Sequence, residues 1–599
     1  MSQDPTTAVF GSYNARSMSA EVVAKGFVAP PQFWNILPLG NSVLTGPRGS
    51  GKTTLLKMLT APGLETWDDP RAEEASALAR YSGVFVPADR SWAGQVEVLT
   101  QCFDDQLRSD LGNAAFVLHS LRAMVQCARW RSGQRGSLRS HDRANIGSGI
   151  EEQIARGVYQ VWGIEQPVGS FYGLQLALRD MIGSLGKVAR QASRESAYEE
   201  ALREHPAMDL DLIEVALAFI ERFNHACGEE DHVWAFLIDE IEFLPQGIQT
   251  KLVSSMRGRD PRIIQKLSIA PYTVTSTEQL STPIGGWEGH DLQMVDLTFG
   301  EKEQGYAFSR ELVARDIGPT KRTPEADEVL GVCELLGGTG FFERPPGEDA
   351  YREGSANAMA IKELAEKDAG FAAWLADHGI DPEHLQDVTG VRRSQTIQKA
   401  IAIILLRREF LHDVQGELKR RSRKRHTVYV GEEGIFAICE NNPRLLKALI
   451  GRLLALHIAG KLRDGTRAEV VEQACMEYQL HLRAIEVGRP VDEALIPRRF
   501  VDAIGGAFAD GVYGEQFDPE PPLTFDVAVP DRLRPGLTTM LNQLTHYGAI
   551  VPVGEHSYRL AHMFAPIYRL PLRKGRSRAL TPILRPPRTA VQMELEERP

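Results

Sequence analysis

The sequence has few cysteines, and they are widely spaced. Its six cysteines lie at positions 102, 127, 227, 333, 439 and 475, and no two form a C-x-x-C pair. Closely spaced cysteines are the mark of zinc ribbons and of the disulfide frameworks of small secreted domains. The spacing argues against both. It fits a protein of a reducing compartment, and we expect a cytoplasmic location.

Long apolar runs are also missing. A transmembrane helix needs about 18–20 consecutive, mostly apolar residues, and the sequence has no such run. The first five residues lack the basic and apolar regions of a signal peptide. We therefore expect no membrane partner.

Positive charge is not in excess. The chain has 68 Lys and Arg against 79 Asp and Glu, a formal net charge of −11, so any surface for nucleic acid must be local. The remaining composition, 43% hydrophobic and 25% charged residues, is that of an ordinary globular protein. The length of 599 residues predicts two to four domains.

The stretch from Gly46 to Thr53 has the form G-x-x-x-x-G-K-[ST]. Apolar residues before and after it predict a strand that enters a glycine-rich turn and a helix that leaves it. Glycines let the backbone wrap closely around a polyphosphate, and the N–H groups and the positive end of the helix dipole favour its charge. A chance glycine turn is the alternative, and the flanking strand and helix argue against it.

This P-loop assigns the phosphate-binding residues and the cofactors, ATP and Mg²⁺. Lys52 would add its charge to the β- and γ-phosphates, and the Thr53 hydroxyl would bind Mg²⁺. The residues expected to contact the nucleotide are Gly46, Pro47, Arg48, Gly49, Ser50, Gly51, Lys52, Thr53 and Thr54.

The segment from Val233 to Glu240 is an apolar run that ends in two acids. It predicts a buried central strand that delivers both carboxylates to the edge of a parallel sheet where ligands bind. Asp239 would hold Mg²⁺, and Glu240 would activate the attacking water. Nucleotide kinases need no base that activates water, so Glu240 favours hydrolysis.

Three further apolar segments predict strands, at residues 81–89, 266–273 and 291–297. Thr273 and Thr275, near the end of the second, are candidates for a γ-phosphate contact, with a purely structural role as the alternative.

Helical apolar spacing from about 95 to 230 predicts an insertion between two strands of the core. The arginines between 129 and 143 predict a flexible basic loop inside it, which is either solvated or contacts nucleic acid. Before the P-loop, Phe27 and Phe33 either pack on the adenine ring or close the edge of the core.

The C-terminal half is mainly helical and contains two basic segments, at 417–426 and 569–588. A helix over 537–546, followed by strands at 548–553 and 557–560, has the order of a recognition helix and wing. That helix has no Lys or Arg, which leaves protein docking open as well as DNA reading.

Three features together carry a resemblance: Gly46–Thr53, Asp239-Glu240, and Asn442-Pro443-Arg444 at the start of a helix before the winged-helix-like end. The chain resembles AAA+ ATPases of the origin-recognition initiator-like branch, including its bacterial stand-alone members. Signal-transducing ATPases with numerous domains are similar in their core. The resemblance implies that Arg444 is a lid arginine that reaches the γ-phosphate and takes part in catalysis.

The expected fold is therefore α/β, a P-loop NTPase (AAA+) core with a parallel sheet, a helical lid and a C-terminal winged-helix-like domain. We expect the core over 1–310, with its insertion at about 95–230, and the lid region over 311–488. The winged-helix-like domain would span 489–570, and a basic, disordered tail would span 571–599.

The favoured function is a slow, Mg²⁺-dependent ATPase that acts as a switch on DNA or a DNA-bound complex through 417–426 and 569–588. The alternative is a regulatory or scaffold ATPase that controls a separate effector protein, as in bacterial immunity modules. Oligomeric AAA+ proteins take an arginine finger from a neighbour. Arg257, Arg259 and Arg262 are candidates for it, with a plain surface loop as the alternative, so a homo-oligomer stays open.

Overall fold

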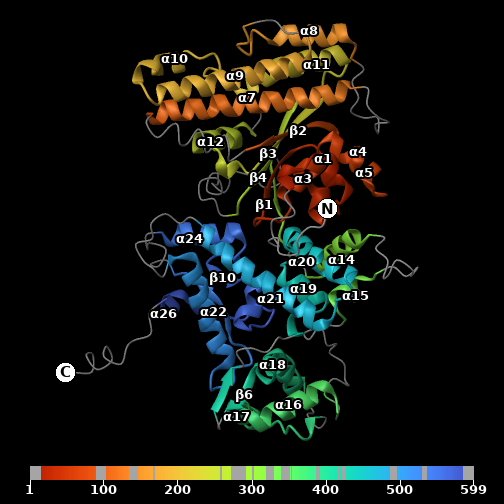
Figure 1. The fold of residues 1–599 in the computed structure, drawn as a ribbon, viewed down its shortest axis with the longest axis vertical. Helices are drawn as coiled ribbons and strands as arrows, with labels where there is room; N and C mark the ends of the chain where they lie inside the picture. The colour runs from red at the N-terminus through yellow and green to blue at the C-terminus, as the bar shows by residue number, and fades with distance from the viewer. Residues whose placement is uncertain are drawn as a thin grey trace, which may run out of the picture. The chain divides into compact units, whose positions relative to one another are not determined.

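The computed structural model describes most of the chain, and the chain divides into two compact units. The described residues are 15–88, 103–133, 146–165, 169–256, 260–271, 292–299, 302–318, 330–338, 351, 354–385, 391–414, 417–420, 427–485, 495–528 and 536–584. One unit spans Asn14–Phe299, and the second begins at Gly300 (Figure 1). The expected domain boundaries at 310, 488 and 570 stay predictions. Each unit is described by itself.

A five-stranded parallel sheet forms the centre of the N-terminal unit, in the order β2-β3-β4-β1-β5. The strands are β1 (Asn41–Thr45), β2 (Tyr81–Pro87), β3 (Val233–Asp239), β4 (Ile263–Ile269) and β5 (Leu292–Asp296). β4 lies between β1, which enters the P-loop, and β3, which ends at the acidic pair. The predicted α/β fold with a parallel sheet is confirmed.

The side chains of β3 alternate between two hydrophobic clusters. Trp234, Phe236 and Ile238 join the cluster on one face of the sheet, and Ala235 and Leu237 join the cluster on the other. A parallel sheet covered on both faces needs apolar side chains at every position of its central strands. This is why the segment before Asp239 is an unbroken apolar run.

Short helices cover the face of Ala235 and Leu237. Phe27 and Phe33 are buried there, with ring centroids 5.3 and 5.6 Å from that of Trp67. They close the edge of the core, as one of the two interpretations expects, and a contact with adenine stays a prediction. The helices of this layer are η2 (Ala15–Ser17), α1 (Ala20–Lys25), α2 (Pro31–Ile36), α3 (Lys52–Met58), α4 (Ala61–Thr66) and α5 (Ala72–Leu78).

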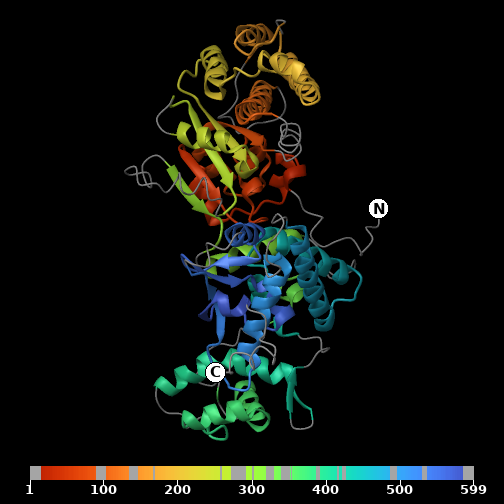
Figure 2. The same ribbon diagram turned by 90° about the vertical axis from the view of Figure 1, so that its left-hand side faces the viewer.

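Longer helices of the insertion cover the opposite face. They are α7 (Asp105–Ser132), α8 (Ser148–Val158), α9 (Phe171–Ala192), α10 (Glu199–Arg203) and α11 (Leu212–Cys227), with a 3-10 turn η4 (Ser196–Tyr198). Helices α7, α8, α9 and α11 run along one another as a bundle with α7 nearest the sheet, and Figure 2 views them nearly end-on. After β3 come η5 (Ile241–Phe243) and α12 (Gln246–Ser255).

The arginine-rich segment of the insertion is not the loop that the sequence predicts at its start. Arg129 and Arg131 lie within α7, and Arg131 is buried and pairs with Glu229 at 2.6 Å. Residues 134–145 lie outside the described residues.

The C-terminal unit begins with helices. They are α14 (Lys302–Ile317), α15 (Val332–Leu336), α16 (Ala356–Lys367), α17 (Ala369–Asp377), α18 (Val391–Phe410), α19 (Glu432–Ile438), α20 (Pro443–Ile458) and α21 (Asp464–His481), with the 3-10 turns η8 (Thr427–Tyr429) and η9 (Leu482–Ala484). A hairpin of β6 (Leu411–Val414) and β7 (Glu417–Arg420) follows α18. Only the first four residues of the basic segment 417–426 are thus described, as β7.

A second, four-stranded sheet in the order β11-β8-β10-β9 ends the unit. Its elements are α22 (Pro497–Tyr513), β8 (Pro522–Asp526), α24 (Leu537–Tyr547), β9 (Ile550–Pro552), β10 (Ser557–Leu560), η11 (His562–Phe564), α25 (Ala565–Tyr568), β11 (Arg576–Ala579) and α26 (Leu580–Leu584). Strands β8, β10 and β9 pair antiparallel, whereas β11 pairs parallel with β8.

The tail expected to be disordered over 571–599 is ordered at its start. Strand β11 fills the free edge of β8, and the Arg573 guanidinium donates to the Lys399 and Pro519 carbonyls at 2.7 and 2.6 Å. Backbone pairing and these contacts hold residues whose composition alone favours disorder. Residues 585–599 lie outside the described residues.

Among the helices that the structure describes, none combines the length and apolar character needed to cross a membrane.

A buried ion pair joins α16–α18 to α22. Arg407 and Asp368, each 1% exposed at the side chain, approach to 2.7 Å, and Arg407 also donates to the Val512 and Gly514 carbonyls. The guanidinium is therefore matched by three acceptors away from water.

We expect Asp368→Asn to lower the free energy of unfolding of the C-terminal unit by about 3–5 kcal/mol, because it leaves a buried cation without its counter-charge. Calorimetry or urea unfolding measures the change. Glu383→Gln is the matched control, since its 2.5 Å pair with Lys362 is exposed and should contribute less than about 1 kcal/mol. Equal losses in the two variants would contradict the account.

Candidate active site

The P-loop connects the end of β1 to the start of α3. Gly49 and Gly51 have φ of 89° and 103°, the left-handed region that favours glycine. Lys52 is the first residue of α3, and Thr53 and Thr54 follow it in the first turn. The motif glycines thus turn the chain so that the Lys and Thr side chains of the helix start face the same loop.

The Lys52 ammonium is folded into the loop. Its Nζ donates to the Gly46 carbonyl and, at 3.4 Å, to the Pro47 carbonyl. Burial lowers the pKa of Lys52, and nearby carboxylates, Glu242 first and Asp239 next, act in the opposite direction. The acids keep the ammonium charged, and its hydrogen-bond partners in the loop are neutral carbonyls that phosphate oxygens can replace.

The Asp239 carboxylate connects the P-loop helix to the neighbouring strand. Its Oδ2 accepts a hydrogen bond from Thr53 Oγ1 at 2.7 Å, and its Oδ1 accepts one from Ser268 Oγ at 2.6 Å. Ser268 in turn accepts from the Glu240 backbone N–H at 2.8 Å. Three elements, α3, β3 and β4, therefore meet at one buried carboxylate.

Glu240 adopts a left-handed backbone, with φ 57° and ψ 51°. Non-glycine residues rarely do so, and such strain concentrates at functional sites. Its Oε2 lies 3.0 Å from Arg16 Nη1, and Arg16 also donates to the Ala88 carbonyl at the end of β2. Burial and the Asp239 charge raise the pKa of Glu240, so its carboxylate accepts a proton more readily than an exposed one.

Glu242 is a third acid beside the first two. Both of its carboxyl oxygens are buried, and neither has a hydrogen-bond partner among the described residues. Burial raises its pKa to about 7, although the Lys52 charge acts against this. The P-loop lysine thus faces an acidic strand end with more carboxyl groups than it can pair.

The residues present fit a magnesium-bound triphosphate. The Thr53 hydroxyl and the Asp239 carboxylate, 2.7 Å apart, are both ligands that Mg²⁺ prefers, and Mg²⁺ is usually bound through one or two protein oxygens and substrate phosphates. Within the described residues, no group of three or more His, Cys, Asp and Glu side chains could hold a metal by itself. The buried Ser50 hydroxyl has no partner there either and is available to an anion.

Other predicted site residues belong to the second unit, lie outside the described residues or are bound to other groups. Arg444 belongs to the C-terminal unit, in the first turn of α20. Thr273, Thr275, Arg257 and Arg259 lie outside the described residues. The remaining arginine-finger candidate, Arg262, is bound to Asp260 at 2.5 Å and Glu221 at 2.9 Å.

Three residues of the site escaped the sequence analysis. Ser268 has a faint signal, a hydroxyl within the apolar end of β4, but its role depends on β4 lying next to β3. Glu242 is visible as a third acid in Asp-Glu-Ile-Glu. Arg16 has no local signal, because it is far from both motifs along the chain.

The sheet order, with β4 between the P-loop strand β1 and the acidic end of β3, defines a P-loop ATPase of the AAA+ class. A family model described as ORC-CDC6-like matches residues 8–580, nearly the whole chain. The protein therefore belongs to the ORC-CDC6-like family, and membership implies ATP binding and, in general, ATPase activity. No curated protein and no solved structure gave a significant match.

The position of Glu242 predicts a pH dependence of stability. Its folded carboxyl keeps a proton up to about pH 7, whereas the unfolded chain releases it near pH 4.5. Between these values unfolding releases a proton, so stability falls as pH rises. Without nucleotide, Glu242→Gln should match the wild type at pH 4 and be more stable at pH 8. The gain should be at most about 3 kcal/mol, from about 1.4 kcal/mol per pKa unit.

Unfolding curves at several pH values measure this gain. Glu74→Gln, which changes an exposed glutamate of the same unit, should show no such trend. A Glu242→Gln gain that is the same at pH 4 and pH 8 would mean that the carboxyl titrates normally.

Proposed function

We propose that the protein is a Mg²⁺-dependent molecular switch that slowly hydrolyses ATP to ADP and phosphate and acts on DNA or a DNA-bound complex. The observation that carries the proposal is the hydrogen bond between Thr53 and Asp239. It joins the two motifs, 186 residues apart in sequence, with Glu240 next to the contact.

In this proposal Lys52 exchanges its carbonyl partners in the loop for phosphate oxygens, and Thr53 and Asp239 hold the magnesium ion. When bound, Mg²⁺ neutralises phosphate charge and orients the γ-phosphate. Ser268 keeps the Asp239 carboxylate and the Glu240 backbone in place. Glu240 orients the attacking water and accepts its proton.

Slow turnover is supported by Arg16. Its guanidinium lies 3.0 Å from the Glu240 carboxylate, although burial and the Asp239 charge still hold the pKa of Glu240 above its ordinary value. The ion pair must open before this carboxylate can orient a water molecule, and that added step suits a timer better than a fast enzyme.

Arg444 is proposed as the lid arginine. Asn442 caps α20 and accepts from the Arg444 and Leu445 N–H groups at 3.0 and 3.4 Å, which fixes the start of the helix that carries Arg444. Contact of its guanidinium with the γ-phosphate would let the lid distinguish ATP from ADP.

Action on DNA is supported by the C-terminal sheet. Helix α22, strand β8, helix α24 and the β9–β10 hairpin follow the chain order of a winged helix, with β10 between β8 and β9. Basic residues of the segment 417–426 would add phosphate contacts, among them the exposed Lys419 of β7. The tail would supply fewer phosphate contacts than the sequence predicts, because Arg573 and Arg576 already bind protein groups.

A scaffold ATPase that controls a separate effector protein is the second candidate. The observation that favours it is the surface of α24, where Thr538 and Thr539 are exposed and no Lys or Arg occurs along the helix. A neutral helix of this kind suits docking to protein as well as DNA.

ATPase assays of the wild type and Glu240→Gln, each with and without double-stranded DNA, test the proposal. We expect hydrolysis by the wild type to rise with DNA. Glu240→Gln should lose at least about 100-fold in kcat, since a positioned base contributes about 10²–10⁴-fold, while it still binds ATP.

Glu73→Gln, at an exposed position of α5, serves as the matched control and should behave as the wild type. ATP binding with little turnover and no response to DNA would favour the scaffold. A wild type that neither binds nor hydrolyses ATP would refute the ATPase proposal itself.

A further inference from the structure

The turn that precedes α20 has an unusual backbone. Glu440 and Asn441 are consecutive, and their φ angles are 53° and 52°. Left-handed conformations are uncommon for residues other than glycine, and they persist only where the surroundings hold them. The turn leads directly into Asn442, Pro443 and Arg444.

The side chain of Glu440 is held by the β9–β10 hairpin, which we call the wing. Arg559 of β10 donates from both terminal nitrogens, Nη1 to Oε1 and Nη2 to Oε2, each at 2.6 Å. The His562 backbone N–H donates to Oε1 at 2.8 Å. Burial disfavours the charged carboxylate, yet the Arg559 guanidinium brings the pKa of Glu440 down to about 2, so the pair is ionised at neutral pH.

Asn441 is held by a different element, α14. Ser309 of α14 donates to its Oδ1 at 2.8 Å. Asn442 then caps α20 through the N–H groups of Arg444 and Leu445. From Glu440 to Arg444, the chain is therefore fixed at successive residues by α14, the wing and the helix cap.

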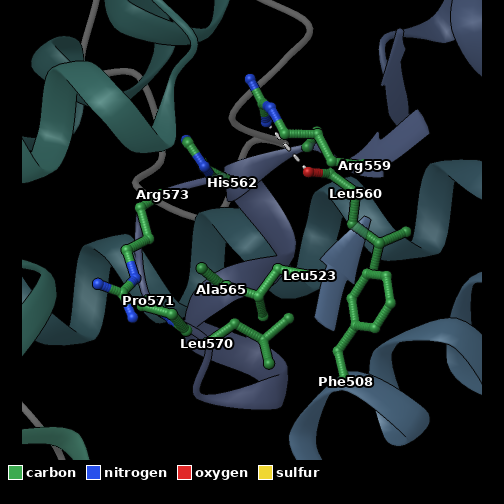
Figure 3. Close-up of a pocket in the computed structure, with 10 residues that line it drawn as sticks. Phe508, Leu523, Arg559, Leu560, His562, Ala565, Leu570, Pro571 and Arg573 are labelled. Atoms are coloured by element: carbon green, nitrogen blue, oxygen red, sulfur yellow. Dashed lines mark hydrogen bonds between the residues drawn. The ribbon is translucent and has the colours of Figure 1, made fainter. Parts of the chain in front are cut away.

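The strand that carries Arg559, β10, packs against α22 and β8. Figure 3 shows its neighbour Leu560 with Phe508 of α22 and Leu523 of β8, around a cavity of about 20 Å³. That space admits roughly one water molecule, so no small-molecule ligand is expected there. The packing fixes β10, and β10 fixes the guanidinium that binds Glu440.

We propose that Glu440 is a positioning residue for Arg444, with Arg559 of the wing strand as its anchor. The inference rests on the proposed role of Arg444 at the γ-phosphate. Movement of the wing changes the turn at Glu440 and therefore the start of α20, which carries Arg444. The placement of the wing is thus coupled to the contact between Arg444 and the γ-phosphate. By linkage, a partner that prefers one placement of the wing must alter the preference for ATP over ADP, and the reverse.

The test compares affinities for ADP and for a non-hydrolysable ATP analogue, each with Mg²⁺, in the full chain. The readout is the ratio of the two dissociation constants, which a general loss of folded protein leaves unchanged. Arg444→Ala should lower the ATP preference at least about tenfold, as expected for a lost charged contact. Glu440→Gly should lower it at least about threefold, and the double variant should be no worse than Arg444→Ala.

Glycine is chosen at 440 because it removes the carboxylate and still favours the left-handed backbone. Arg559→Lys is the second variant. It keeps one charge without the bidentate geometry and should give an intermediate ratio even if Glu440→Gly folds poorly. Thermal unfolding of each variant accompanies the titrations.

Glu477→Gln is the matched control. It breaks a 3.0 Å pair between Arg452 of the same helix, α20, and Glu477 of α21, away from the Arg444 turn, and should leave the ratio unchanged. A wild-type ratio in Glu440→Gly and Arg559→Lys, with a lowered one in Arg444→Ala, overturns this inference alone. A wild-type ratio in Arg444→Ala overturns the lid arginine of the proposed function and the inference with it.

Discussion

The Asp239 carboxylate joins the elements of the candidate site through two hydrogen bonds. Thr53 donates to one oxygen from the P-loop helix, and Ser268 donates to the other from the neighbouring strand. A buried carboxylate needs such partners, because an unpaired charge away from water is costly. The same contacts fix where Lys52 and Glu240 lie relative to it. The sheet order matters because it places β4, and so Ser268, directly beside β3.

The C-terminal unit contains two ion pairs that differ in their exposure to solvent. The Arg407–Asp368 pair is buried away from solvent, and Arg407 also donates to two backbone carbonyls. This arrangement suits a rigid contact between α16–α18 and α22. The Glu440–Arg559 pair is more accessible, at 24% and 14% side-chain exposure, and it supports a strained turn. A strained turn whose carboxylate depends on one arginine of β10 is the more natural place for a change of conformation, since strain is released when that support moves.

The sequence alone predicts those features that arise from residues close together along the chain. The P-loop and the acidic strand end are contiguous patterns, so the parallel sheet and the Thr53–Asp239 contact could be anticipated. Ser268 and Arg16 could not, because their roles depend on strand order and on a segment distant in sequence. Strand β11 was missed for a related reason. Its basic, proline-flanked composition favours disorder, and only the free edge of β8 makes it a strand.

The central claim is that Thr53 and Asp239 form a magnesium–ATP site with Lys52. The most direct test is the affinity for a fluorescent ATP analogue in Mg²⁺ and in EDTA, for the wild type and Asp239→Asn. The account predicts that Mg²⁺ tightens binding to the wild type by about tenfold, equivalent to about 1.4 kcal/mol. Asp239→Asn should lose most of that gain and keep its affinity in EDTA. Binding that does not depend on Mg²⁺, or a full Mg²⁺ effect in Asp239→Asn, would contradict it.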